Sequence, residues 1–220
     1  MRRPLPIAVL VLAFLAGGVL PGAAAPARIP PFRASIHALS ASERSDMTPD
    51  VWRRGCPVAL EDLRHVSLPF IGFGGHARRG ALVVNASVAR EVVAIFRDLY
   101  RDRVAIRRMR PIQAYGGDDF ASIEADNTSA FNCRAATGSS RWSQHAYGLA
   151  IDINPIENPY VSGGRTSHPA SVPYLDRSRV RPGMAVDGGA LVRAFESRGW
   201  GWGGRWSGTV DLQHFSESGG

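Results

Sequence analysis

The sequence has no lysine and only two cysteines, although its 220 residues include 26 basic side chains. Arginine therefore carries all of the basic charge, and its planar guanidinium pairs with phosphates and carboxylates. The arginines are scattered and no nucleic-acid recognition motif accompanies them, so we expect no nucleic-acid partner. Attraction to an anionic cell wall and a genome composition that favours arginine are both open as explanations of the basic charge.

The sequence also lacks an apolar run long enough to span a membrane. The run from Ile7 to Leu20 is shorter than the roughly 20 residues that a spanning helix needs. It follows Arg2 and Arg3 and precedes a small-residue stretch, which is typical of a cleaved export signal. We predict a signal peptide over residues 1–27 and a secreted or cell-wall-associated protein without stable membrane insertion after cleavage. Loss of the two arginines lowers the formal net charge from +7 to +5.

The two cysteines, Cys56 and Cys133, are too far apart for the C-x-x-C spacing of a metal-binding pair. Outside the cytoplasm thiols are oxidised, so we predict a disulfide between them. A metal-binding role is the alternative.

Internal repeats and low-complexity segments are absent, and 45% of the residues are hydrophobic, which suits one globular domain. The 24 glycines and 15 prolines favour turns and loops. Residues 28–50 have no sustained periodicity, so we predict a linker there, followed by one domain over residues 51–220. We expect a monomer.

The periodicity within this domain predicts an α+β fold with a small antiparallel sheet, flanking helices and long loops. Strands are predicted over residues 63–71, 81–84, 112–115 and 148–154. One helix is predicted after Asn85 as N-cap, with Val88, Val92, Ile95, Phe96 and Leu99 on its apolar face, and another over residues 190–198. Residues 116–140 are predicted to be loop with short helical pieces, and residues 156–184 a long surface excursion.

The residues that carry chemistry fall in two short motifs. In the first, Ser143 to Asp152, an imidazole (His145) and a carboxylate (Asp152) lie seven residues apart across a glycine. In the second, Asp211 precedes His214 by three residues. A catalytic zinc ion needs three protein ligands and one open position, and the two histidines with Asp152 make such a set. Asp211 is then left as a general base.

The pattern S-x-H-x-x-G-x-A-x-D followed by a late carboxylate-x-x-His resembles the D-alanyl-D-alanine carboxypeptidase family of zinc peptidases. This family includes VanY-type carboxypeptidases and phage L-alanyl-D-glutamate endopeptidases. The resemblance implies a fold like that of Hedgehog and D-Ala-D-Ala peptidases, with Zn²⁺ bound by His145, Asp152 and His214 and with Asp211 as base. It also implies hydrolysis of peptide bonds in the stem peptides of peptidoglycan, by carboxypeptidase or endopeptidase action.

Two departures from the family pattern concern catalysis. Many relatives carry Glu where this chain has Asp211, which is one methylene shorter. The upstream Ser-Gly-Tyr-Arg segment that often supplies an oxyanion-stabilising arginine is absent. We assign that role to Arg134, because a guanidinium near the metal binds an oxyanion or a substrate carboxylate. A surface arginine beside a disulfide is the alternative.

The substrate groove is predicted from aromatic and loop residues around the two motifs. The Trp/Gly segment over residues 199–206 offers indoles for stacking, so Trp202 and Trp206 are assigned to substrate binding, with core packing as the alternative. Ser143 and Tyr147, in the metal loop, are assigned to substrate binding rather than to the reaction. Two other functions stay open: a non-catalytic, zinc-containing module that binds the cell wall, and an arginine-rich protein that binds anionic polymers.

Overall fold

The computed structural model describes residues 29–219, so the predicted signal peptide over residues 1–27 lies outside the described residues. Within this range the helices are α1 (Ala41–Met47), α2 (Ala89–Arg101), α3 (Asp119–Glu124) and α4 (Ala190–Glu196). The strands are β1 (Ser35–Ala38), β2 (Leu63–Ile71), β3 (Ala77–Asn85), β4 (Arg108–Met109), β5 (Asn127–Thr128), β6 (Ala150–Asp152), β7 (Tyr160–Val161), β8 (Gly201–Trp202), β9 (Val210–Asp211) and β10 (His214–Ser216). No helix in this range is long and apolar enough to cross a membrane.

The strands form two three-stranded antiparallel sheets and two small pairs. One sheet has the order β1-β2-β3 and the other β6-β10-β8, while β4 pairs with β5 in parallel and β7 pairs with β9 in antiparallel fashion. Few helices and small, mostly antiparallel sheets make this an α+β fold, as the sequence predicts.

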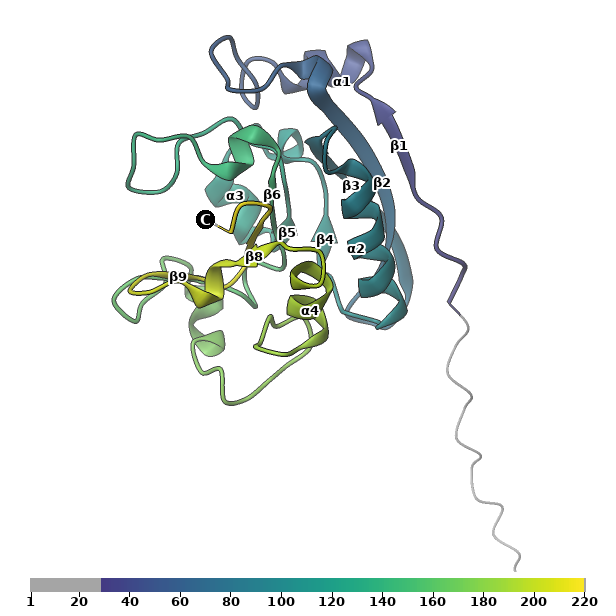
Figure 1. The fold of residues 1–220 in the computed structure, drawn as a ribbon. Coiled ribbons are helices and arrows are strands. Elements are labelled where there is room, and N and C mark those ends of the chain that lie inside the picture. The colour runs from purple at the N-terminus through teal and green to yellow at the C-terminus, as the bar shows by residue number, and fades with distance from the viewer. Residues whose placement is uncertain (1–28, 220) are drawn as a thin grey trace, which may run out of the picture.

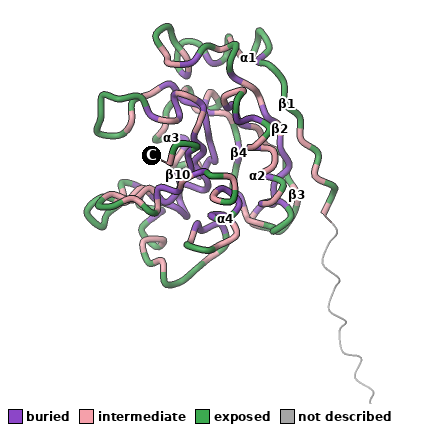
Figure 2. The backbone as a smooth tube through the Cα atoms, in the orientation of Figure 1, coloured by how far each residue is buried: buried purple, intermediate pink, exposed green. Residues whose placement is uncertain are grey.

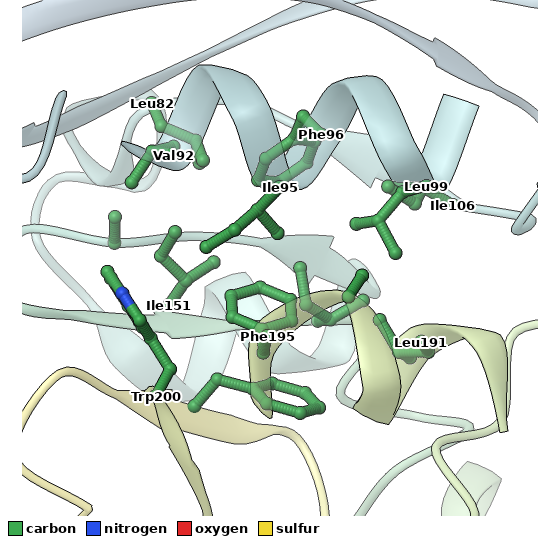
Figure 3. Close-up of a cluster of buried hydrophobic side chains, with 14 of the residues drawn as sticks. Leu82, Val92, Ile95, Phe96, Leu99, Ile106, Ile151, Leu191, Phe195 and Trp200 are labelled. Atoms are coloured by element: carbon green, nitrogen blue, oxygen red, sulfur yellow. The ribbon is translucent and has the colours of Figure 1, made fainter. Parts of the chain in front are cut away.

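The main core lies between the first sheet, α2 and α4 (Figures 1 and 3). Alternate residues of β2 point to this core because side chains alternate across a strand. The apolar face of α2 meets them, and Phe195 of α4 stacks on Phe215 of β10 with ring centroids 4.2 Å apart. Burial is concentrated on the strands and on the inner helix faces, while the long loops at the periphery are largely exposed (Figure 2). Packing of α4 on β10 therefore links the second sheet to the main core.

A second core cluster lies beside α1 and includes Leu39, Met47 and Cys133. Cys133 forms the predicted disulfide with Cys56, with Cα atoms 5.9 Å apart. The bond ties the start of the domain to the segment that precedes the first motif.

The structure differs from the predicted elements at several places. Residues 28–50 include β1, which pairs with β2, and α1, whose Met47 is buried. The side chains of β1 are all exposed, so its pairing depends on backbone hydrogen bonds that leave no apolar periodicity in the sequence.

The predicted strand at residues 112–115 is wrong, because Ile112–Tyr115 forms a 3-10 helix closed by Gly116 at a φ of 61°. The first long helix starts at Ala89 instead of directly after Asn85, whose side chain accepts a hydrogen bond from the Ser87 amide. The predicted strand at residues 148–154 is shorter, since Asn154 has a φ of 46°. A local side-chain bond and left-handed backbone positions thus decide these boundaries.

Candidate active site

Three side chains from separate segments converge beside the second sheet. The antiparallel pairing of β6 with β10 places His214 directly opposite Asp152. His145 lies in a 3-10 helix (Gln144–Tyr147) that starts at Ser143, whose hydroxyl accepts a hydrogen bond from the His145 amide at 3.3 Å. The backbone register and this short helix therefore bring the two motifs together.

Gly148 holds the His145 segment against the first sheet. It ends the 3-10 helix with a φ of 69°, and its carbonyl accepts a hydrogen bond from the Asn85 amide at 2.9 Å. A Cβ atom at this position would lie 2.6 Å from that amide nitrogen. Glycine adopts the left-handed conformation without strain and has no Cβ atom to block the close approach, which explains its place in the first motif.

The donor atoms of the three residues are spaced as ligands of one metal ion. His145 Nε2 lies 3.1 Å from Asp152 Oδ1 and 3.2 Å from His214 Nδ1, and His214 Nδ1 lies 3.2 Å from Asp152 Oδ1. Ligands about 2.0–2.1 Å from a tetrahedral zinc ion are separated by roughly 3.3 Å, so the spacing fits such an ion. All three residues are buried, with at most 6% of their surface exposed.

The surroundings also prepare these residues for a cation. His145 Nδ1 donates a hydrogen bond to the Ala130 carbonyl at 2.6 Å, which leaves the lone pair on Nε2 facing the cluster. Burial opposes ionisation of Asp152, but the charges and hydrogen bonds of the two histidines outweigh it and hold its pKa below the usual range. The set therefore offers two imidazoles and a carboxylate, which are common zinc ligands.

Asp211 stands next to this cluster on β9, which pairs with β7. Its Oδ1 atom is shielded from solvent and has no hydrogen-bond partner among the described residues. Burial, with a contribution from the nearby Asp152 charge, raises the pKa of Asp211 to about 7. A Cβ atom on Gly203 would lie 2.5 Å from the Asp211 carbonyl oxygen, so this glycine of the Trp/Gly segment allows the close approach of β9.

Arg134 faces the same cavity as Asp211 and His214. Its Nη2 atom forms an ion pair with Asp119 Oδ2 at 2.9 Å, and its Nη1 atom donates to the Ala135 carbonyl at 3.3 Å. Its Nε atom is buried and has no hydrogen-bond partner among the described residues. The positive charge opposes the rise in the pKa of Asp211, so the two side chains interact electrostatically.

The cavity at the cluster has a volume of about 270 Å³ and is lined by His145, His214, Asp211 and Arg134, together with Ser143 and Trp206. A neighbouring hollow of about 270 Å³ shares Arg134, Asp211, Tyr160 and Thr137 with it. The two hollows therefore adjoin each other at Arg134 and Asp211.

Residues 137–217 match the family described as D-alanyl-D-alanine carboxypeptidase. This confirms the resemblance predicted from the sequence, and the family match indicates a peptidase. The matched segment contains His145, Asp152, Asp211 and His214, whereas Arg134 and the disulfide lie upstream of it. No curated protein and no solved structure matches the chain.

Within this carboxypeptidase-like segment, the four residues assigned to substrate binding lie in different places. Ser143 and Trp206 line the cavity, and the Trp206 and His214 ring centroids are 5.3 Å apart. Trp202 is buried, donates from Nε1 to the Leu212 carbonyl at 2.9 Å and is stacked on Phe215. Tyr147 does not line the cavity, and its carbonyl accepts a hydrogen bond from Asn85 at 3.0 Å. The structure thus places Ser143 and Trp206 at the cavity and Trp202 in the core.

Other cavity residues have no assignment from the sequence. Tyr160 reaches the site because β7 pairs with β9, and no local pattern marks it. Trp142 and Gln144 also line the cavity, and both lie next to motif residues. That adjacency is the signal by which they could have been found.

Proposed function

We propose that this protein is a zinc-dependent peptidase that hydrolyses peptide bonds in peptidoglycan stem peptides. The observation that carries the proposal is a carboxylate, Asp211, that lines one cavity together with the two histidines of the buried His-Asp-His set. A purely structural zinc site needs no base next to the metal, so Asp211 favours an enzyme over a binding module. The family match over residues 137–217 supports the same reaction class.

A zinc ion held by His145, Asp152 and His214 would supply a Lewis acid that polarises the scissile carbonyl and acidifies water. As the water oxygen forms a bond to the carbonyl carbon, the Asp211 carboxylate accepts a proton from that water. It returns that proton to the amine nitrogen as the C–N bond breaks. Burial raises the pKa of the Asp211 carboxyl group, which makes it a stronger proton acceptor than an exposed carboxylate.

Arg134 favours carboxypeptidase action within this class. A terminal D-Ala-D-Ala unit ends in a free carboxylate, and a guanidinium on the cavity wall binds that group through charged hydrogen bonds. Arg134 is already paired with Asp119, so a substrate carboxylate competes with the Asp119 carboxylate for it. Asp119→Asn should therefore lower KM for a substrate with a free C-terminus, whereas Arg134→Ala should raise it.

The test uses a synthetic stem pentapeptide that ends in D-Ala-D-Ala, with a free or an amidated C-terminus, and mass spectrometry of the products. We expect release of D-Ala from the free form by the zinc-loaded protein, and loss of release on chelation. Glu217→Gln, which alters an exposed carboxylate, serves as the matched control for Asp211→Asn. Internal cleavage that is indifferent to the C-terminus would indicate an endopeptidase. Bound zinc without cleavage of any stem peptide would indicate the binding module.

A further inference from the structure

A second group of metal-type donors lies on the first sheet, outside the candidate active site. It consists of His37 on β1, His65 on β2 and Glu43 on α1. The strand register pairs His37 with His65, and their rings stack with centroids 4.6 Å apart and an interplanar angle of 26°. The two imidazoles are thus brought together by the sheet itself.

The helix cap holds the carboxylate in place independently of the histidines. Glu43 Oε2 accepts a hydrogen bond from the Ser40 amide at 2.7 Å, and the Ser40 hydroxyl accepts one from the Glu43 amide. In this arrangement Oε1 lies 3.8 Å from His65 Nε2, and Oε2 lies 3.9 Å from His37 Nδ1. One donor atom from each of the three residues lies within 4.8 Å of the others.

The neighbouring arginines do not compete for this carboxylate. Arg44 pairs with Glu61, and Arg64 donates to the backbone carbonyls of Glu61 and Leu63. Over the described part of the chain, the ion-pair partners of Glu43 are the two histidines. In a protein with 26 arginines, this carboxylate therefore faces imidazoles, which are metal ligands when neutral.

We propose that His37, His65 and Glu43 bind a second divalent cation of the zinc type, with water completing its coordination. Imidazole nitrogens select zinc, copper or nickel over magnesium and calcium. The His37 side chain is 48% exposed and His65 and Glu43 are less so, which leaves room for water ligands. A bound ion would tie β1 and α1 to β2.

This second site should bind zinc more weakly than the candidate active site. The Glu43 carboxylate oxygens lie 3.8–3.9 Å from the two imidazole nitrogens, compared with 3.1–3.2 Å between donor atoms in the buried His-Asp-His set. Closing that gap requires movement of side chains that are partly in solvent. The second ion should therefore appear as a separate, weaker equivalent in a titration.

The test is a Zn²⁺ titration of the metal-free full chain, followed by calorimetry and native mass spectrometry. We expect two equivalents for the wild-type chain and the loss of the weaker one in His37→Ala and in Glu43→Gln. Glutamine is accepted in a capping box, so Glu43→Gln removes the charge and keeps the helix cap. His76→Ala alters an exposed histidine on the β2–β3 turn and should retain both equivalents.

A double variant, His145→Ala with His214→Ala, separates the two sites. It should lose the tighter equivalent and keep the weaker one, which then disappears when His37→Ala is added. Zinc binding that is unchanged in His37→Ala and in Glu43→Gln, whether the wild-type chain binds one ion or two, would overturn the proposal. Displacement of the weaker zinc by a modest excess of Mg²⁺ would also contradict ligation by imidazole.

Discussion

Gly148→Ala should disturb the candidate active site through the backbone, without altering any of the proposed metal ligands. The new Cβ atom would lie 2.6 Å from the Asn85 amide nitrogen and 3.2 Å from both a Leu63 methyl carbon and the Val84 carbonyl carbon. Two of these neighbours are backbone atoms of β3, which cannot rotate away. The Gly148 loop must then move from β3, and His145 moves with it.

The cost has two parts that a matched variant separates. A non-glycine residue in the left-handed region costs about 1–2 kcal/mol, and Gly148 has a φ of 69°. Overpacking adds about 1–3 kcal/mol. Gly116 has a similar φ of 61°, but a Cβ atom there meets nothing within 4 Å. Gly116→Ala should therefore cost only about 1–2 kcal/mol, and Gly148→Ala about 2–5 kcal/mol.

The assay is urea unfolding of both metal-free variants at one pH, with zinc affinity measured on the folded proteins. We expect Gly148→Ala to be less stable than Gly116→Ala and to bind zinc more weakly, while Gly116→Ala binds zinc as the wild-type chain does. Equal losses of stability with equal zinc affinities would refute the view that contact with β3 positions His145.

Three further predictions concern the stability of the fold. Burial and the neighbouring Asp126 carboxyl raise the pKa of Glu157 to about 7, although Arg107 opposes the shift. The folded state therefore keeps a proton on Glu157 that the unfolded state releases at a lower pH. The free energy of unfolding should fall as the pH rises from about 4.5 to about 7. Glu157→Gln should reduce that fall, as measured by urea titrations at several pH values. Reduction of the disulfide, which spans 77 residues, should lower the unfolding free energy by up to about 4 kcal/mol, and an unchanged urea midpoint would contradict this. Phe195→Ala should cost about 3–5 kcal/mol, because the ring is fully buried between α4 and β10, and a loss below 1 kcal/mol would show that the core does not depend on it.

The sequence predicts best where local spacing determines which residues meet. The strand over residues 63–71 is found as predicted, because Val66, Leu68 and Phe70 alternate onto the face that packs in the main core. The candidate ligands His145, Asp152 and His214 are brought together because one lies in a tight glycine-closed turn and two lie opposite each other on paired strands. Asp152 and His214 are 62 residues apart, so it is residue type and the family resemblance that predict their meeting, not local spacing.

The sequence does not predict features that depend on contacts with residues far away in the chain. The exposed strand β1 is held by backbone pairing with β2, and its side chains show no sustained apolar alternation that would predict a strand. Trp202 lies in the core because its indole reaches the Leu212 carbonyl, and a Trp/Gly segment alone does not indicate which tryptophan faces the cavity. Tyr160 enters the site through the pairing of β7 with β9, at a distance of about fifty residues in the chain.

The decisive measurement compares zinc content and stem-peptide hydrolysis in His214→Ala and Asp211→Ala. Both variants are prepared metal-free and then supplied with one equivalent of zinc per chain. His214→Ala should lose the tight zinc and the activity together, since it removes one of the three proposed ligands. Asp211→Ala should keep the zinc and lose about 10²–10⁴-fold in rate, the usual contribution of a general base. If Asp211→Ala stayed fully active, or if His214→Ala kept the tight zinc, the assignment of base and ligands would be wrong.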